Sequence, residues 1–457
     1  MAADRSPDID VVVAGAGAAG LAAALYCAEA GHDVVLAEAH ESYREGSNTA
    51  MSTAMVPAGG SRWQRESGID DAPERFYDDV MRKTGGSADA TIAGALTGVA
   101  PELVEWLAGP CGVPLELVTD FSYPGHSRER CHAVEDRAGR TLHRHLSRAR
   151  SERPEITFAI PMRLTGVETD DEGTVAAAML APPGGEPDRI ETRAVVLATS
   201  GYGAKPELVK RHAPEAARAL YFGGDGSTGD ALAIGEELGA DTGYLDAYQG
   251  HGSVAHPHGV LVTWATVMHG AVLVNSPGER FGDETIGYSE YAALVLAQPE
   301  HTAWVVYDER VHNACRRFRD YATLVEARAV RWADDVAALA ETVGAPEGSL
   351  ASTLEQARGA ARGSRGDEFG RSFWEQPLEP PYAAVKVTGA LFHTQGGLLV
   401  DGDARVLRGG EPIQGLYAAG GAAAGMSGRG ANGYLAGNGL LAALGLGYLA
   451  GRHLGSL

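Results

Sequence analysis

Three glycines and a carboxylate near the start of the chain have the types and spacing of a dinucleotide-binding turn. Gly15, Gly17 and Gly20 form a GxGxxG pattern, and Glu38 follows eighteen positions after Gly20. Gly15 permits the tight turn, Gly17 lets the backbone approach a pyrophosphate, and Gly20 allows a helix and a strand to pack closely. The N-terminus of the following helix offers N–H groups to the anion, while Glu38 is placed to accept hydrogen bonds from ribose hydroxyls. These residues therefore predict a dinucleotide site, and the alternative is an ordinary glycine-rich turn.

The segments around this turn have the patterns of alternating strands and helices. Residues 9–14 form an apolar run typical of a buried parallel strand, residues 21–30 have a helical pattern, and residues 33–37 predict a second strand. Further on, residues 175–180 and 190–198 flank a Pro-Pro-Gly-Gly turn and predict a hairpin. The strand–helix–strand order at the N-terminus indicates an α/β fold with a parallel sheet.

The chain is organised as one domain interrupted by another. Small-residue turns recur at residues 198–201 and 415–421, each after an apolar run, whereas the sequence between them becomes richer in His, Trp and Tyr. We therefore predict a nucleotide-binding domain formed by residues 1–248 and 386–457, with a second domain of residues 249–385 inserted into it.

The net charge and the cysteine spacing exclude several kinds of binding partner and site. The formal net charge of −22 argues against nucleic acid and against an anionic membrane, and the 61 glycines are about twice the usual share. The four cysteines are scattered at Cys27, Cys111, Cys131 and Cys315. Without a CxxC pair they indicate neither a disulfide framework nor a zinc site, and a reducing cytoplasm fits best. The first strand begins too soon after Met1 for a signal peptide, and the apolar residues 439–451 are too few to span a bilayer.

Several further motifs follow in order along nearly the whole chain. They lie at residues 195–203, 224–241, 271–284, 393–397, 415–421 and 437–440. With the N-terminal turn, they make the chain similar to the flavoprotein subunits of fumarate reductase and succinate dehydrogenase and to relatives that include 3-ketosteroid dehydrogenases. The resemblance implies FAD and a Rossmann-type, GR2-like FAD-binding domain interrupted by an α+β substrate or capping domain. A plain NAD-dependent dehydrogenase, the competing interpretation, does not explain the glycine-rich C-terminal segment.

The resemblance also assigns cofactor residues, with the adenine half of FAD in the N-terminal fold and the flavin at the seam with the cap. They are Gly15, Gly17, Ala18, Ala19, Gly20, Glu38, Ala39, Ser47, Asn48, Thr49, Ser52, Thr53, Ala198, Thr199, Ser200, Gly201, Asp230, Gly420, Gly421, Gly439, Leu440 and Leu441. Respiratory members carry a histidine bonded to the flavin where this chain has Asn48, so the resemblance implies noncovalent FAD. A polar surface turn is the alternative interpretation of residues 46–53.

One departure from the fumarate reductases concerns the proton donor. They carry an arginine four residues after the glutamate that matches Glu284, and this chain has Tyr288 there. The ketosteroid dehydrogenases place their catalytic tyrosine at the corresponding position, so the resemblance implies that Tyr288 acts on a ketone substrate. A half-buried packing residue is the alternative interpretation of this tyrosine.

A phenol base needs help to remove the hydrogen next to a carbonyl. The gap between the two pKa values is about ten units, each worth about 1.36 kcal/mol, so hydrogen-bond donors must stabilise the forming enolate oxygen. The ketosteroid enzymes imply Tyr434 and a backbone N–H of residues 437–439, such as that of Gly439, as these donors. Tyr123 is a candidate partner that lowers the pKa of Tyr288 or relays its proton, and the alternative is a loop aromatic that covers the core.

Two histidines and an arginine suggest a carboxylate on the substrate. His251 and His393 fall where fumarate-type enzymes hold substrate carboxylates, and Arg429 lies near the family's substrate arginine, where its guanidinium would anchor a carboxylate. A structural or exposed histidine is the alternative in each case. The remaining histidines at positions 126, 132, 143 and 145 are expected on a solvated face formed by the arginine-rich residues 128–153.

Together these residues favour an FAD-dependent desaturase that forms a C=C bond beside a ring carbonyl. The substrate would be a 3-ketosteroid or a small oxo-cycloalkane carboxylate such as 4-oxocyclohexanecarboxylate, with Tyr288 taking the α-proton and FAD the β-hydride. No iron–sulfur or haem ligands are evident, so an external electron acceptor such as O2 is required. The alternatives are a fumarate reductase-like reductase or dehydrogenase of unsaturated acids and a flavin-binding protein without turnover.

Overall fold

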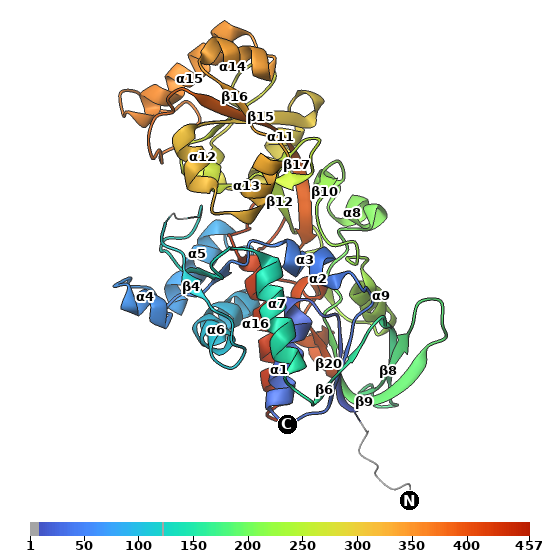
Figure 1. Ribbon diagram of the computed structural model, residues 1–457. Helices are drawn as coiled ribbons and strands as arrows, with labels where there is room; N and C mark the ends of the chain where they lie inside the picture. The colour runs from blue at the N-terminus through green and yellow to red at the C-terminus, as the bar shows by residue number, and fades with distance from the viewer. Residues whose placement is uncertain (1–8, 121–122) are drawn as a thin grey trace, which may run out of the picture.

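A computed structural model of the protein describes residues 9–120 and 123–457. The chain forms two lobes: a lower one built on a parallel sheet and an upper one built on a second sheet (Figure 1). The N-terminal residues on which the signal-peptide expectation rests lie outside the described residues.

The sheet of the lower lobe combines strands from the N-terminal and the C-terminal parts of the chain. Its parallel strands run in the order β20 (Glu411–Ala418), β9 (Asp188–Leu197), β1 (Ile9–Ala14), β2 (Val34–Ala37) and β6 (Ile156–Ala159), with β19 (Arg405–Arg408) antiparallel at the edge. The predicted hairpin is confirmed: β8 (Val175–Ala181) pairs antiparallel with β9, and β7 (Arg163–Thr169) pairs with β8. The central strands β1 and β2 of this sheet are almost continuously apolar and buried, as is typical of parallel sheets, and the predicted α/β class is confirmed.

Two helices from opposite ends of the chain pack beside this sheet. Helix α1 (Ala18–Glu29) begins three residues before the predicted start, and α16 (Asn438–Leu454) lies against it. A Cβ atom at Gly447 would lie 2.2 Å from the carbonyl oxygen of Ala19, so only glycine allows this approach. Helices α6 (Ala90–Ala108) and α7 (Gly139–Ser151) cover the same side (Figure 1).

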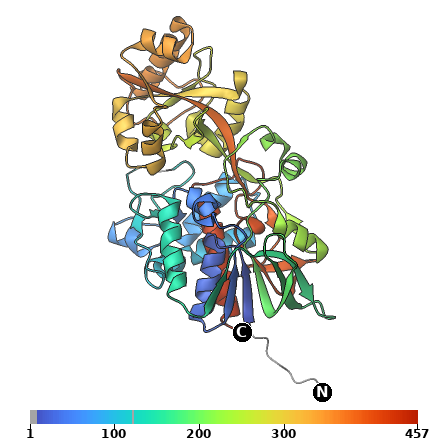
Figure 2. The ribbon, with the colours of Figure 1, turned by 45° about the vertical axis from the view of Figure 1, so that its right-hand side comes forward.

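The upper lobe is organised around one long strand. Strand β17 (Tyr382–Thr394) pairs with β12 (Tyr248–Ala255), β15 (Thr302–Asp308), β10 (Leu220–Tyr221) and β16 (Arg331–Ala333), and the sheet is completed by β13 (Val260–Leu261) and β14 (Val272–Val274). Helices α11 (Tyr288–Leu296), α12 (Glu309–Cys315), α13 (Arg319–Glu326), α14 (Val336–Val343) and α15 (Glu347–Ala361) surround it. Figure 2 shows β17 descending from the upper lobe toward the lower sheet. The predicted domain boundaries stay a prediction, and the one at residue 385 falls inside β17.

The remaining α-helices and strands complete the described chain. They are α2 (Tyr43–Gly46), α3 (Asn48–Met51), β3 (Val56–Pro57), α4 (Arg62–Glu66), α5 (Pro73–Lys83), β4 (Glu116–Leu117), β5 (Cys131–Ala133), α8 (Pro206–His212), α9 (Asp230–Glu237), α10 (Ala265–Met268), β11 (Thr242–Gly243) and β18 (Gly397–Leu398). No helix within residues 9–120 and 123–457 is long and apolar enough to cross a membrane.

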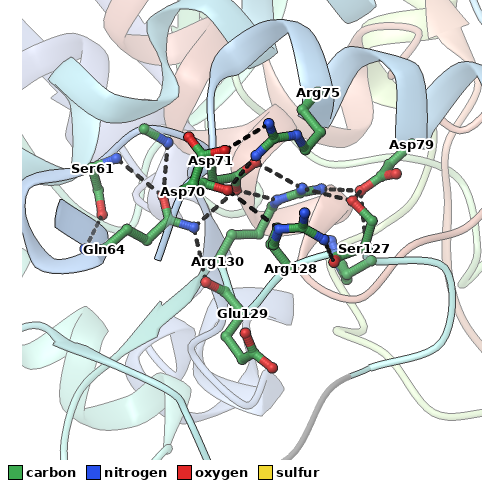
Figure 3. A network of polar contacts seen from close by, with 12 residues as sticks. Ser61, Gln64, Asp70, Asp71, Arg75, Asp79, Ser127, Arg128, Glu129 and Arg130 are labelled. Atoms are coloured by element: carbon green, nitrogen blue, oxygen red, sulfur yellow. Dashed lines mark hydrogen bonds and ion pairs between the residues drawn. The ribbon is translucent and has the colours of Figure 1, made fainter. Parts of the chain in front are cut away.

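The expectation of a solvated face at residues 128–153 is confirmed for Arg128, Arg140, Arg144 and Arg148, which are exposed, and was wrong for Arg130. Arg130 is fully buried, with its Nε 2.9 Å from Asp71 Oδ2 and its Nη1 2.5 Å from Asp79 Oδ2, and Figure 3 shows it between these carboxylates. Burial raises the pKa of Asp79, but hydrogen bonds from Ser127, Arg82 and Arg130 outweigh it and lower that pKa to about 2. A long arginine can therefore lie inside the protein because two carboxylates neutralise its charge.

Two of the histidines expected on that face are buried as well. His132 Nε2 lies 2.8 Å from Ser61 Oγ, and His143 Nε2 lies 2.8 Å from the carbonyl oxygen of Ala16. Burial lowers the pKa of His132 to about 4 and also lowers the pKa of His143, so both rings are neutral at pH 7. His143 supports the glycine-rich turn from the side of α7.

Candidate active site

One cavity at the seam between the lobes brings most of the predicted residues together. Nineteen of the predicted cofactor residues line it: Gly15, Gly17, Ala18, Ala19, Glu38, Ala39, Ser47, Asn48, Thr49, Ser52, Thr53, Ala198, Thr199, Ser200, Asp230, Gly420, Gly421, Gly439 and Leu440. Tyr123, Tyr288, Tyr434, His251 and His393 line the same cavity. Gly20, Gly201, Leu441 and Arg429 are not among its lining residues.

The glycine-rich turn has the geometry that a pyrophosphate requires. Gly15 has φ +106°, and a Cβ there would lie 2.3 Å from the carbonyl oxygen of Ala198. Gly20 lies behind the turn, where a Cβ would come within 1.8 Å of the carbonyl oxygen of Gly15. At Gly17 the nearest atom to such a Cβ is Thr49 Oγ1 at 3.4 Å, so this glycine leaves open space on the cavity side. The cradle thus fits a ligand that approaches the backbone at the N-terminus of α1.

The side chain of Glu38 is held in place by hydrogen bonds from backbone N–H groups. Its two carboxylate oxygens accept the N–H groups of Ala16 and His40, each at 2.8 Å. The carboxylate is buried at the end of β2 and lines the cavity, where its remaining lone pairs are available to ribose hydroxyls. This donor set and the open side of Gly17 together fit the ribose and pyrophosphate of FAD.

Asn48 ties three loops of the cradle together. Its Nδ2 donates to Ser200 Oγ at 3.1 Å and to Ser227 Oγ at 3.2 Å, and its Oδ1 accepts from the N–H of Gly224 at 2.7 Å. The neighbouring Thr199 Oγ1 is a buried hydroxyl on the cavity wall without a partner among the described residues. A polar group of a bound cofactor would satisfy it.

Aromatic side chains form the other end of the cavity. The ring of Tyr288 lies 5.9 Å from that of Tyr434, 6.5 Å from that of Tyr123 and 4.8 Å from that of His251, measured between centroids. His251 is stacked between Tyr288 and Phe392, with its centroid 5.0 Å from the phenylalanine ring. Residues far apart in the sequence therefore gather around Tyr288.

Buried ion pairs fix the segment that carries Tyr288. Glu284 lies in the preceding turn, accepts from Arg280 at 2.7 Å and from Arg371 at 3.1 Å, and is fully buried. Burial alone would raise the pKa of Glu284, but Arg371 and Arg280 lower it below its ordinary value. Tyr288 is the first residue of α11, and Lys83 of α5 holds this end of the helix through Glu290. These contacts orient Tyr288 from both lobes.

Burial keeps the three phenols protonated. Burial, followed by the neighbouring Tyr434 and Tyr123, raises the pKa of Tyr288 well above its ordinary value. Burial also raises the pKa of Tyr123 and of Tyr434. Tyr123 therefore raises the pKa of Tyr288 rather than lowering it, and of the two roles suggested for Tyr123 only the proton relay stays a prediction.

The two histidines are neutral hydrogen-bonding groups. Burial lowers the pKa of His251 to about 3 and that of His393 to about 4. His251 Nδ1 accepts the backbone N–H of Ser253 at 3.2 Å, so its proton is on Nε2. Strands β12 and β17 pair antiparallel with Gln249 opposite His393, which places the two histidines on neighbouring strands.

Tyr434 and Gly439, the two predicted donors, are hydrogen-bonded to each other. The N–H of Gly439 donates to Tyr434 Oη at 3.2 Å, which leaves the hydroxyl proton of Tyr434 free for another acceptor. His393 is nearby, because a Cβ at Gly439 would lie 2.8 Å from His393 Nε2 and 3.1 Å from Tyr434 Oη. The glycine amide thus orients the phenol.

Arg429 lies away from this group. Its side chain is 67% exposed, its Nη1 lies 3.2 Å from Asp246 Oδ1, and its guanidinium stacks on Tyr244. Arg163, the one Lys or Arg among the described lining residues, lies 3.5 Å from Asp230 at the cofactor end. The aromatic end of the described cavity therefore has no cationic anchor for a carboxylate.

Sequence reasoning missed several residues of the aromatic end. Phe392 and Trp264 line the cavity and contact His251. Gln395 contacts His393, and Ser427 contacts Gln395. Gln395 lies inside the motif of residues 393–397, where it was given no role, and Phe392 directly precedes this motif, which was the available signal. Nothing local marks Trp264 or Ser427. No group of three or more His, Cys, Asp or Glu side chains in the described part of the chain could hold a metal ion.

A family comparison agrees with the cradle. The chain belongs to the FAD-binding domain family, whose model matches residues 10–440. The predicted cofactor, FAD, is therefore confirmed.

Two of the similar proteins are named for different reactions. The NADH:fumarate oxidoreductase of Klebsiella pneumoniae is 31% identical over 93% of this chain, which spans only 46% of that protein. The 4-oxocyclohexanecarboxylate 2-dehydrogenase of Sinomonas cyclohexanicum is 27% identical over 97% of this chain and 92% of its own length.

Solved structures of both kinds of enzyme are also similar to the chain. The chain is similar to the open conformation of a flavocytochrome c3 fumarate reductase, with a TM-score of 0.79 and 27% identity over 100% of this chain and 79% of the other. It is also similar to the 3-ketosteroid-Δ4-(5α)-dehydrogenase of Rhodococcus jostii RHA1, with a TM-score of 0.76 and 26% identity over 99% of this chain and 98% of the other. The fold of these flavoproteins is thus shared along the whole described chain.

Proposed function

We propose that the protein is an FAD-dependent desaturase that introduces a C=C bond next to the carbonyl of a ring ketone. The observation that carries the proposal is the group of Tyr288, Tyr434 and Tyr123 around one point of the FAD cavity, in a region without a cationic side chain. A site that has groups for proton transfer but no cation to bind a carboxylate suits a neutral ketone better than a dicarboxylate.

Each side chain has a defined part in this reaction. Tyr288, in its phenolate form, takes the proton from the carbon next to the carbonyl and becomes a neutral phenol. The hydroxyl of Tyr434 donates to the oxygen on which negative charge develops. FAD, when bound, supplies the two-electron oxidant that accepts a hydride from the neighbouring carbon. The ketone loses one proton and one hydride, a C=C bond forms, and an external acceptor such as O2 must then take the electrons.

The two relatives that act on ring ketones support this substrate class. They are the 4-oxocyclohexanecarboxylate and 3-ketosteroid dehydrogenases, and the chain covers more than nine-tenths of each. Because Arg429 lies outside the cavity, we propose a ring ketone without a carboxylate as the better substrate. We also propose noncovalent FAD, since the amide of Asn48 is engaged in joining the cradle loops.

Reduction or dehydrogenation of unsaturated carboxylic acids is the second candidate. The identity to the NADH:fumarate oxidoreductase favours it, and the neutral state of His251 and His393 argues against it. A dicarboxylate would find two N–H donors there but no fixed positive charge.

Anaerobic bleaching of the bound FAD separates these possibilities. The holoenzyme is mixed with ring ketones, with the same ketones bearing a carboxylate, and with succinate, while flavin absorbance is followed. Bleaching by ketones alone supports the desaturase, bleaching by succinate alone supports the second candidate, and no bleaching by either leaves a flavin-binding protein without turnover.

The variant Tyr288→Phe tests the base. It should lower ketone-dependent bleaching by about 10²–10⁴-fold at unchanged FAD content, the range typical of general acid–base groups. Tyr307→Phe is the matched control, because Tyr307 is a buried tyrosine of the upper lobe that lies outside the cavity. Full activity of Tyr288→Phe on a ketone would remove this residue from the mechanism.

A further inference from the structure

His393 is linked to a buried polar chain that the reaction as described does not use. Gln395 Nε2 lies 2.8 Å from His393 Nδ1, and Ser427 Oγ donates to Gln395 Oε1 at 3.0 Å. Gln395 is 5% exposed and Ser427 2%, so water does not compete for these groups. A hydrogen-bonded chain of this kind fixes which atom carries each proton.

The direction of the chain follows from the serine. A buried hydroxyl must donate its proton, and in the described part of the molecule Gln395 Oε1 is the acceptor that Ser427 Oγ reaches. The carbonyl end of the amide therefore faces Ser427, and its NH2 end faces His393 Nδ1. Since Nδ1 accepts this N–H, the proton of the neutral imidazole is on Nε2.

The backbone holds the amide in this position. The N–H of Gln395 donates to Ala247 O, and its carbonyl accepts from Gly425, each at 2.8 Å. A Cβ at Gly425 would lie 3.2 Å from Gln395 Oε1, so the amide packs directly against this glycine. Gln395 thus has little freedom to withdraw from His393.

The protonated nitrogen of His393 lies beside Tyr434. The ideal Cβ position at Gly439 is 2.8 Å from His393 Nε2 and 3.1 Å from Tyr434 Oη, so both groups border the same point of the cavity wall. His393 can donate its Nε2 proton. Tyr434 can donate its hydroxyl proton, because its oxygen already accepts the N–H of Gly439. Two donors that converge in this way can share one oxyanion.

We propose that Gln395 and Ser427 are positioning residues that hold His393 in its Nε2–H form, which makes His393 the second donor to the carbonyl oxygen of the substrate. The role of His393 toward a ketone rests on the proposed function, whereas the proton position does not. His393 thereby becomes an oxyanion donor rather than a ligand for a carboxylate.

Nitrogen-15 NMR of the histidine rings in the FAD-bound protein tests the proton position directly. We expect His393, assigned by its loss in His393→Gln, to be neutral with the proton on Nε2 at pH 7. In Gln395→Met, Nδ1 loses its donor and faces the carbonyl of Thr394 at 3.4 Å, so the Nδ1–H form should become populated. His251, held by the backbone of Ser253, should stay unchanged as an internal control.

Ketone turnover tests the consequence. Gln395→Met should lower kcat by at least about tenfold with KM changed less than about threefold, because an oxyanion donor acts mainly in the transition state. Ser427→Ala, which releases the amide, should lower kcat less, and Ser427→Thr, which keeps the hydroxyl, should restore it. This series keeps the proposal testable if Gln395→Met does not bind FAD.

The two proposals fail in different ways. A wild-type His393 that carries its proton on Nδ1, or on both nitrogens, overturns the inference whatever the substrate is. So does a folded Gln395→Met with unchanged kcat and an unchanged NMR signature. If His393 is in the Nε2–H form but no ketone bleaches the FAD, the proposed function fails and the assignment of the proton stands.

Discussion

The two ends of the cavity are built from different kinds of contact. At the cofactor end, backbone groups and absent side chains make the cradle, as at Gly15 and Gly20, where an added Cβ would strike a carbonyl oxygen. At the other end, Tyr288 of α11 contacts His251 of β12 and Tyr434 of the loop before α16, and His251 stacks in turn on Phe392 of β17. The cradle therefore depends on local backbone geometry, whereas the aromatic end depends on how distant segments pack. A single substitution in the cradle should abolish FAD binding, whereas a substitution at the aromatic end should lower turnover but leave FAD bound.

Gly20→Ala should have the largest effect. Its Cβ would lie 1.8 Å from the carbonyl oxygen of Gly15, a contact that no rotamer relieves, so we expect the protein to lose bound FAD and to fold poorly. The ratio of flavin to protein absorbance and the Tm measure both effects. Gly98→Ala is the control, because Gly98 lies in α6 with nothing within 4 Å of its added Cβ, and it should be neutral or slightly stabilising. An FAD content equal to wild type in Gly20→Ala would contradict this account of the cradle.

Arg130→Met should have the next largest effect. The change removes the counter-charge of the buried Asp71 carboxylate and one of the two counter-charges of Asp79, which keeps its ion pair with Arg82. Breaking such a buried network costs about 3–5 kcal/mol in the free energy of unfolding. Urea unfolding measures it. The matched control is Arg65→Met, since the Arg65 side chain is 64% exposed and its ion pair with Glu105 is on the surface. A loss below about 1 kcal/mol in Arg130→Met would mean that the carboxylates find other partners.

The cofactor end of the cavity could be predicted from the sequence more completely than the aromatic end. The turn at Gly15, Gly17 and Gly20 was readable because its function depends on residues that are adjacent in the chain. Tyr288 was found through its register against Glu284, and His393 through its motif. Arg130 was misjudged because the two carboxylates that neutralise it lie 59 and 51 positions away. Gln395 lies in the motif of residues 393–397 but received no role, and Ser427 was missed, because their hydrogen bond forms only when the segment after β17 meets the loop before α16.

The pH dependence of ketone desaturation sharpens the comparison at the aromatic end. Tyr288 must be deprotonated to accept the α-proton, and burial with its neighbouring phenols raises the pKa of Tyr288 well above its ordinary value. The active form is therefore the minor one at neutral pH, and kcat/KM should rise about tenfold per pH unit from pH 6 to pH 10 without a plateau. Anaerobic bleaching by a ring ketone measures it, with FAD content and far-UV circular dichroism checked at each pH. A profile that is flat across this range would show that another group takes the proton.

Arg429→Ala should have the smallest effect and decides between two views of the substrate. Arg429 is 67% exposed and pairs with Asp246 outside the cavity, and such a surface ion pair contributes about 0–1 kcal/mol. We expect KM to change less than about twofold for a ring ketone with or without a carboxylate. If Arg429 instead anchors a carboxylate, the variant should raise KM at least about tenfold for the carboxylated ketone and leave the uncharged ketone unchanged. Tyr434→Phe is the reference variant, because the loss of an oxyanion donor should lower kcat for both ketones alike. Only a rise in KM that is selective for the carboxylated ketone would show that Arg429 binds the substrate.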